Sequence, residues 1–191
     1  STSGDANDNI GIGTGALTTL TTADGIVAIG SSALAALTTG AKNVAIGYNA
    51  GLGITEGDEN TALGHEALKT NILGDANTAI GYRALMTYAS ADGTGHNTAL
   101  GYQAGAVLVG GVFNTFIGSS SGITCTTALN NTAVGHQSMY SIPADQAIDS
   151  CVAIGRGALM GAAGTTTNIL GTVAIGKHAL KNLTTGADNL A

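Results

Sequence analysis

The sequence has few of the side chains that fill the wide core of a globular domain. It contains no tryptophan, aromatic residues make up only 4% of its 191 residues, and Pro143 is its single proline. Glycine is abundant instead, with 30 residues, and it lets backbone segments approach one another closely. A hydrophobic content of 44% argues against disorder. The composition therefore favours thin layers of backbone.

Charge is also scarce. Charged residues make up 9% of the chain, and six Lys and Arg against twelve Asp and Glu give a net charge of −6. Because the few cations are scattered along the sequence, we expect no binding to nucleic acid or to anionic membranes. No apolar run approaches the roughly 18 residues of a spanning helix, so direct membrane insertion is not expected either.

What the sequence does contain is one pattern repeated ten times: Asn-Thr-Ala-Ile-Gly, a few variable residues, Ala-Leu, and a turn rich in Thr, Gly and Asp. Most repeats have 17 residues, and three have 20 or 21. A unit this short cannot bury a core alone, so the repeats must stack on one another. They start at Asn9, Ile26, Asn43, Asn60, Asn77, Asn97, Asn114, Asn131, Cys151 and Thr172, and an eleventh starts at Asn189.

The repeat predicts one coil of a solenoid. Numbered from its Asn, positions two to four form a short strand of period two, and a second extended segment is expected around positions seven to nine. A helix competes for the Ala-Leu segments, but Gly and Thr recur before the roughly 12 residues that an amphipathic helix needs. We therefore predict an all-β parallel β-solenoid of about ten 17-residue coils. It forms a single array over residues 1–191, with a partial coil at 1–8, full coils from 9 and a partial coil at 189–191, as in a segment of a longer array.

Two positions hardly vary. Position five is always glycine, which points to a positive φ or to a lack of room for a Cβ atom. Position one is asparagine in most coils, and stacked asparagines can form a ladder of amide hydrogen bonds. The structural corners are Gly30, Gly47, Gly64, Gly81, Gly101, Gly118, Gly135, Gly155 and Gly176, as well as Gly13, and the ladder comprises Asn43, Asn60, Asn77, Asn97, Asn114 and Asn131.

Positions three and four leave two arrangements open. Position three is alanine in eight copies, and position four is always Ile, Leu or Val. If the alanines face the interior, the aliphatic side chains form a continuous outer stripe; in the reverse case, alanine forms a flat outer strip. A long aliphatic stripe cannot stay in water on a soluble monomer. We therefore expect a homo-oligomer, with a homotrimer as the simplest closed form and a monomer or a helical polymer as alternatives.

Two rows of side chains suggest ligand sites. Four rings follow the corner glycine in successive coils, either as a stacking platform for sugars or as a solvated or inter-chain ladder. Threonines at position two recur on one face, where regular hydroxyls could order water in an ice-binding protein, although threonine is also a good strand residue. The rings are Tyr48, His65, Tyr82 and Tyr102, and the threonines are Thr61, Thr78, Thr98, Thr115 and Thr132.

The remaining candidates for chemistry are weak. Cys125 and Cys151 lie 26 residues apart, little more than one coil, and are either two unpaired small residues or a disulfide. The turn acids match no calcium-loop spacing, and the four histidines lie in different coils. No nucleophile–base–acid set is present. We expect no enzyme, cofactor or metal site. The turn acids considered are Glu56, Asp58, Glu59, Asp75 and Asp92.

The repeats resemble a known family. Asn43–Gly47 (NVAIG), Asn77–Leu85 (NTAIGYRAL) and Asn97–Gly105 (NTALGYQAG) are similar to the head repeats of trimeric autotransporter adhesins, the YadA-like heads. They are equally similar to related arrays in phage tail fibres and bacterial surface proteins. The resemblance covers residues 9–191 and implies a left-handed β-roll, three chains in one fibre, and attachment. The repeat here is longer than the adhesin-head repeat, which implies larger turns.

The sequence and the resemblance together predict a non-enzymatic extracellular fibre protein at a cell surface or on a virion. It would serve in a surface adhesin or a phage tail fibre, with a receptor or glycan as its partner. The alternative is a structural subunit that polymerises end to end into a filament. A weaker alternative is a monomeric ice- or sugar-binding solenoid.

Overall fold

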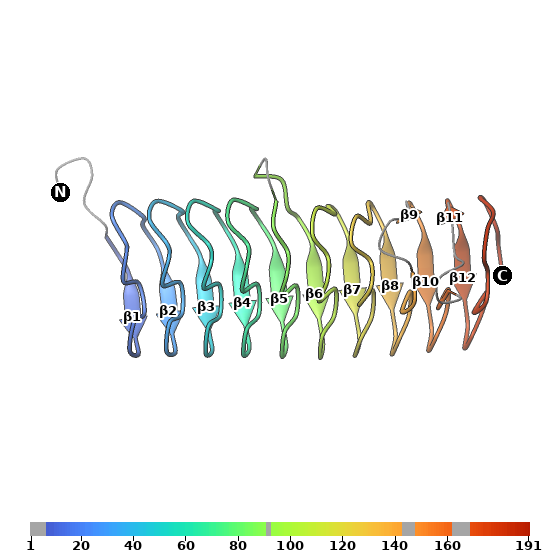
Figure 1. Ribbon diagram of the computed structural model, residues 1–191, viewed down its shortest axis with the longest axis horizontal. Coiled ribbons are helices and arrows are strands. Elements are labelled where there is room, and N and C mark those ends of the chain that lie inside the picture. Colours follow the sequence, from blue (N-terminus) through green and yellow to red (C-terminus); the bar gives the residue numbers. More distant parts are fainter. Residues whose placement is uncertain (1–6, 91–92, 143–147, 162–168) are drawn as a thin grey trace.

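The computed structural model is a parallel β-solenoid in which each repeat forms one coil of a rod (Figure 1). It describes residues 7–90, 93–142, 148–161 and 169–191. One ten-stranded sheet runs along the rod, and its strands pair in parallel from coil to coil, which confirms the predicted fold class. Its strands are β1 (Ile10–Ile12), β2 (Val27–Ile29), β3 (Val44–Ile46), β4 (Thr61–Leu63), β5 (Thr78–Ile80), β6 (Thr98–Leu100), β7 (Thr115–Ile117), β8 (Thr132–Val134), β10 (Val152–Ile154) and β12 (Val173–Ile175).

The strands keep one register despite the unequal repeats. Thr78 pairs with Thr98 across a 20-residue repeat as Thr61 pairs with Thr78 across 17 residues. The extra residues of the long repeats come late in the coil, where β9 (Ile148–Asp149) and β11 (Ile169–Leu170) form a second, two-stranded sheet. The positions of these insertions in the sequence, near residues 91–96, 143–150 and 165–170, predict loops that bulge from one edge of the rod. Much of these segments lies outside the described residues.

In the large sheet from β2 onward, the middle residue of each strand is inside, and it is alanine in every strand except β7, where it is Phe116. In β5, Ala79 is fully buried, whereas Thr78 and Ile80 on either side are partly exposed. The other strands of the large sheet from β2 onward have the same buried middle residue between two more exposed ones. Of the two arrangements that the sequence leaves open, the structure therefore has alanine in the interior and the aliphatic row of position four outside.

The far side of the coil is not a second strand, and this part of the prediction was wrong. Positions seven and nine have left-handed backbone, with φ of 57° at Ser32 and 48° at Leu34, so the chain turns continuously. Its backbone groups still bond between coils, because the Leu34 amide donates to the Ala50 carbonyl at 3.0 Å and the Ser32 amide to the Thr14 carbonyl at 2.9 Å. These inter-coil bonds offset the cost of left-handed backbone in residues other than glycine.

The corner glycines meet both demands that the sequence suggested. Gly118 has a φ of 126°, a conformation that other residues rarely adopt. A Cβ atom there would also lie 2.6 Å from the carbonyl oxygen of Gly135, the corner of the next coil. Gly176, in the last full coil, has a similar φ of 128° but nothing within 4 Å of such a Cβ. Successive corners therefore stack backbone against backbone.

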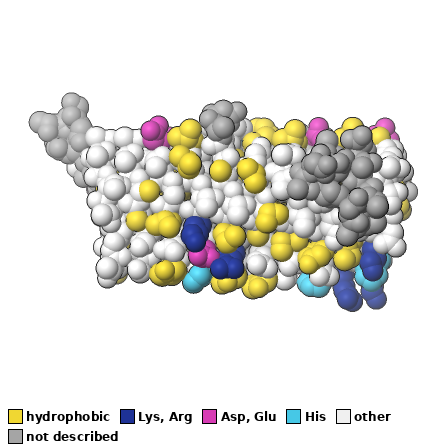
Figure 2. Space-filling view, viewed as in Figure 1, with side chains coloured by type: hydrophobic (Ala, Val, Ile, Leu, Met, Phe, Trp, Pro, Cys, Tyr) yellow, Lys and Arg dark blue, Asp and Glu magenta, His cyan; other side chains and the backbone are white. Residues whose placement is uncertain are grey.

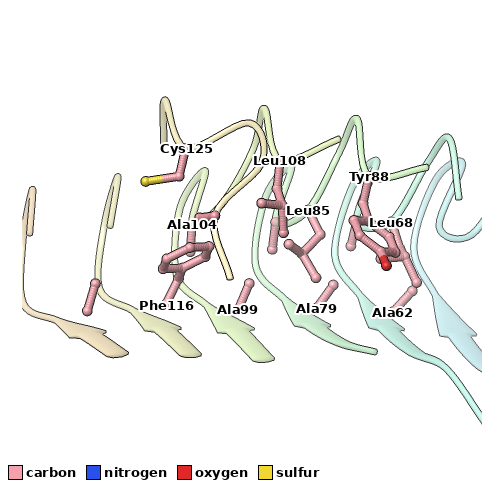
Figure 3. Close-up of a cluster of buried hydrophobic side chains, with 14 of the residues drawn as sticks. Ala62, Leu68, Ala79, Leu85, Tyr88, Ala99, Ala104, Leu108, Phe116 and Cys125 are labelled. Atoms are coloured by element: carbon pink, nitrogen blue, oxygen red, sulfur yellow. The ribbon is translucent and has the colours of Figure 1, made fainter. Parts of the chain in front are cut away.

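The interior is narrow and filled by small and aliphatic side chains (Figure 3). Alanines of the strands face leucines of position nine, such as Leu68 and Leu85. Phe116 replaces one alanine, and position nine is glycine at Gly105 and Gly122 beside it. A Cβ on Gly122 would lie 2.5 Å from the Phe116 ring. The large ring thus occupies space that leucine side chains fill in other coils.

The part of the chain that the structure describes contains no helix, and hence none of the length and hydrophobicity that a membrane span requires.

Candidate interaction surface

The outer face of the large sheet carries a row of aliphatic side chains along the rod. Leu63, Leu100 and Ile154 at position four are 42%, 44% and 39% exposed. Parallel sheets are ordinarily covered on both faces, yet within the described residues no other element lies over this one. The row, which we call the outer stripe, comprises Ile12, Ile29, Ile46, Leu63, Ile80, Leu100, Ile117, Val134, Ile154 and Ile175.

The four rings of position six stack on one another. The ring centroids lie 5.1 Å apart between Tyr48 and His65, 5.3 Å between His65 and Tyr82, and 5.2 Å between Tyr82 and Tyr102. The inner ring faces therefore cover each other and are not open to a sugar. Only the outer faces of Tyr48 and Tyr102 are left, beside Ser31 and Ser119 in the same row. The geometry favours a ladder over a sugar platform along the whole row.

An ion network lies beside these rings. The Glu66 carboxylate accepts hydrogen bonds from Lys69 Nζ and from Arg83 Nε, each at 2.7 Å. The hydrogen bond from Lys69, followed by that from Arg83, lowers the pKa of Glu66 below its usual range. The Arg83 guanidinium also lies 4.9 Å from the centre of the Tyr82 ring, in a cation–π contact. The network ties two coils together at the corner.

The asparagines of position one are buried and bonded from coil to coil. Asn60 Oδ1 accepts hydrogen bonds from both the backbone amide and the side-chain amide of Asn77, each at 3.0 Å. The same pair of bonds recurs at each further step as far as Asn131. Between Asn43 and Asn60 only the backbone amide donates. The row satisfies buried backbone groups that would otherwise lack partners.

The cysteines are free thiols, so the disulfide is not formed. They occupy different positions of the coil: Cys125 lies at position twelve, and Cys151 takes the place of an asparagine at position one. Burial is the main cause that raises the pKa of Cys125 to about 12, and the electrostatic effect of the nearby Cys151 is the second. Cys151 Sγ lies 3.4 Å from the carbonyl oxygens of both Asp149 and Ile169, so its thiol takes the donor place of an asparagine side chain. Both are structural residues.

The two long edges of the rod differ in charge. Apart from Lys42, every Lys and Arg lies at positions six to ten. Apart from Glu66, every acid that the structure describes lies at positions fourteen to nineteen. Three turn acids accept hydrogen bonds from the backbone of the neighbouring coil: Asp24 from Asn7, Asp58 from Ala41, and Asp75 from Asp58. The acidic edge thus has a structural role. No group of acids, His or Cys suited to a metal occurs in the described ranges, and Asp92 lies outside them.

The cations of the last coils gather at the opposite edge. Arg156 and Lys177 occupy position six in consecutive coils, and Lys181 lies at position ten of the same coil as Lys177. Figure 2 shows Lys and Arg side chains together with His at this end of the rod. The charge count of the whole chain concealed this cluster, although cations at the same position of consecutive repeats were a readable signal. We name Arg156, Lys177, His178 and Lys181 the basic corner.

The coil geometry defines the class of protein: a parallel β-solenoid of 17-residue repeats with an uncovered sheet face. Comparison of the chain with protein-family models, with curated proteins and with solved structures finds no match.

Proposed function

We propose that this chain is the rod of a non-enzymatic extracellular fibre protein, in which several copies pack through their outer stripes and serve in attachment. Three copies are the simplest closed arrangement. The observation that carries the proposal is the uncovered apolar face of a parallel sheet, because exposed patches of this kind mark association surfaces.

The attachment role and the location on a cell surface or virion rest on the resemblance of the repeats to YadA-like heads and tail-fibre arrays. The structure adds a physical reason for several chains to act together. Burying a row of Ile, Leu and Val between copies gains about 25 cal/mol for each Å² of apolar surface removed from water. The side chains of position two, threonine in the middle coils, would lie in the same interface beside the stripe.

The oligomeric state tests the proposal. Sedimentation equilibrium of the 191-residue chain should give three times the mass of one chain. A strict monomer would exclude the assembly, and the partly exposed threonines of position two would then make the ice-binding alternative the next to test. A distribution of masses without a limit would favour the end-to-end filament instead.

A charge in the stripe should separate assembly from folding. Leu100→Lys places an ammonium group in the middle of the outer stripe, and we expect monomers with unchanged circular dichroism. Ile72→Lys is the matched control, because Ile72 is 49% exposed and lies at position thirteen, away from this face. Each substitution should change the stability of a single chain by no more than about 0.5 kcal/mol. Equal masses for the two variants would contradict assembly through the stripe.

A further inference from the structure

Within the described residues, the basic corner is a cluster of cations that takes part in no ion pair. Lys42 pairs with Glu59 at 2.9 Å, and Lys69 and Arg83 pair with Glu66. Among the described residues, Arg156, Lys177 and Lys181 have no ion pair, although the chain as a whole is acidic. Uncompensated cations in an acidic protein produce a local positive potential that attracts anions.

The corner backbone holds these cations close together. Strands β10 and β12 pair in register, so Arg156 and Lys177 emerge one above the other behind stacked corner glycines. The His178 amide donates to the Arg156 carbonyl at 2.9 Å, and the Lys181 amide donates to the His178 carbonyl at 3.1 Å. Partial desolvation, followed by the charges of Lys181, Lys177 and Arg156, lowers the pKa of His178. The three cations therefore lie close enough to His178 to interact with it electrostatically.

An open aromatic face lies in the same row. Position six runs from Tyr102 through Ser119 and His136 to Arg156 and Lys177. Tyr102 is 53% exposed and stacks on Tyr82 on one side only, because its neighbour on the other side is a serine. With one coil every ~4.8 Å, Tyr102 and Arg156 are about 14 Å apart along the rod. An aromatic face and a group of cations therefore line one straight edge.

We propose that the basic corner binds a short stretch of an acidic polysaccharide. Its carboxylate or sulfate groups contact Arg156, Lys177 and Lys181, and a sugar ring further along packs on the free face of Tyr102. The proposal rests on the attachment role proposed above and adds a ligand class to it. Position six follows the corner glycine, so the basic corner is separate from the outer stripe that we propose to join the chains.

The arrangement suits an acidic glycan better than a nucleic acid. A few cations release few counterions and give weak non-specific binding to a duplex, and the acidic edge repels a long polyanion. A linear sugar chain is narrow enough to follow one edge, and its rings present C–H faces to an aromatic side chain. Its anionic groups accept charge-assisted hydrogen bonds from Lys and Arg.

Titration calorimetry with the full chain tests the proposal. The probes are a heparin tetrasaccharide, tetragalacturonic acid and the neutral maltotetraose, at low ionic strength. We expect binding of one or both acidic probes and none of maltotetraose, with affinity that falls as salt is added. The absence of binding to both acidic probes overturns the proposal. Tighter binding of a single-stranded oligonucleotide with the same number of charges also overturns it.

Two matched pairs of variants locate the site. Lys177→Gln and Lys42→Gln each remove one exposed cation; we expect only the first to weaken binding, by about tenfold. Tyr102→Ser and Tyr48→Ser each remove one end of the ring stack, and only the first ring faces the basic corner. Equal losses within either pair overturn the proposal, because they would indicate a response to overall charge or to the stack as a whole.

The mass of each variant is measured on the same samples. If Lys177→Gln changes the oligomeric state, the cluster is a contact between chains and the glycan site is wrong. A monomer whose binding depends on Lys177 would contradict the proposed assembly while the glycan site stands. A trimer that binds no acidic glycan would contradict the glycan site alone.

Discussion

The interior and the outer face of this rod divide the side chains in an unexpected way. Within one strand, Ala79 is buried, whereas the larger Ile80 beside it remains partly in water. In most half-buried strands the larger apolar residue lies inside. The difference shows that close backbone stacking sets the width of this interior. The interior has room on the strand side for alanine, so the larger apolar side chains lie outside. Substitutions in the interior should therefore lower the stability of the folded chain, and substitutions on the outer stripe should weaken association between chains.

The largest effect should come from the stacked corners. Gly118→Ala would combine an unfavourable positive φ with a Cβ that lies 2.6 Å from the Gly135 carbonyl oxygen. Backbone strain alone costs about 1–3 kcal/mol, and the contact adds to it. We expect a clear loss in the free energy of unfolding in urea. Gly176→Ala is the control, because it has the strained φ without the contact; an equal loss in both would show that crowding is unimportant.

The next effect should come from the filled interior at Phe116. Gly122→Leu restores the common residue of position nine but places a side chain into the Phe116 ring, and overpacking of this kind costs about 1–3 kcal/mol. Adding Phe116→Ala should recover most of the loss, because the pair then matches other coils such as Ala79 with Leu85. A double-mutant cycle in thermal or urea unfolding measures the coupling. Additive losses would contradict this account.

The smallest loss of stability should come from the ion network of Glu66, Lys69 and Arg83 on the exterior. Glu66→Gln removes two charge-assisted bonds, and we expect a loss of about 1 kcal/mol in the free energy of unfolding at pH 7. Because the pKa of Glu66 is lowered in the folded chain, its contribution is present above the unfolded pKa and disappears as the pH falls through the folded pKa. The free energies of unfolding of the unsubstituted chain and of Glu66→Gln should therefore become equal at acidic pH. A difference that persists there would assign the effect to packing.

The repeats predicted the coil and its parallel register because Asn and Gly mark the same two points in almost every copy. They did not determine which face is inside, since alternation of Ala and Ile fits both arrangements. The left-handed backbone at Leu34 escaped prediction because leucine carries no signal for that conformation. The cluster around Arg156 was missed because net charge averages over the two edges.

The asparagine row joins successive coils through the same hydrogen bond, from the backbone amide of one coil to the Oδ1 atom of the coil before it. Removal of one complete repeat, such as residues 44–60, would bring together two coils whose bonding groups already match. A single inserted residue between positions one and five would instead displace the ladder and the corner together. A gene for such a chain can therefore gain or lose whole repeats by recombination and still encode a folded product. The distance that the rod spans can be adjusted without redesigning the surface that it presents.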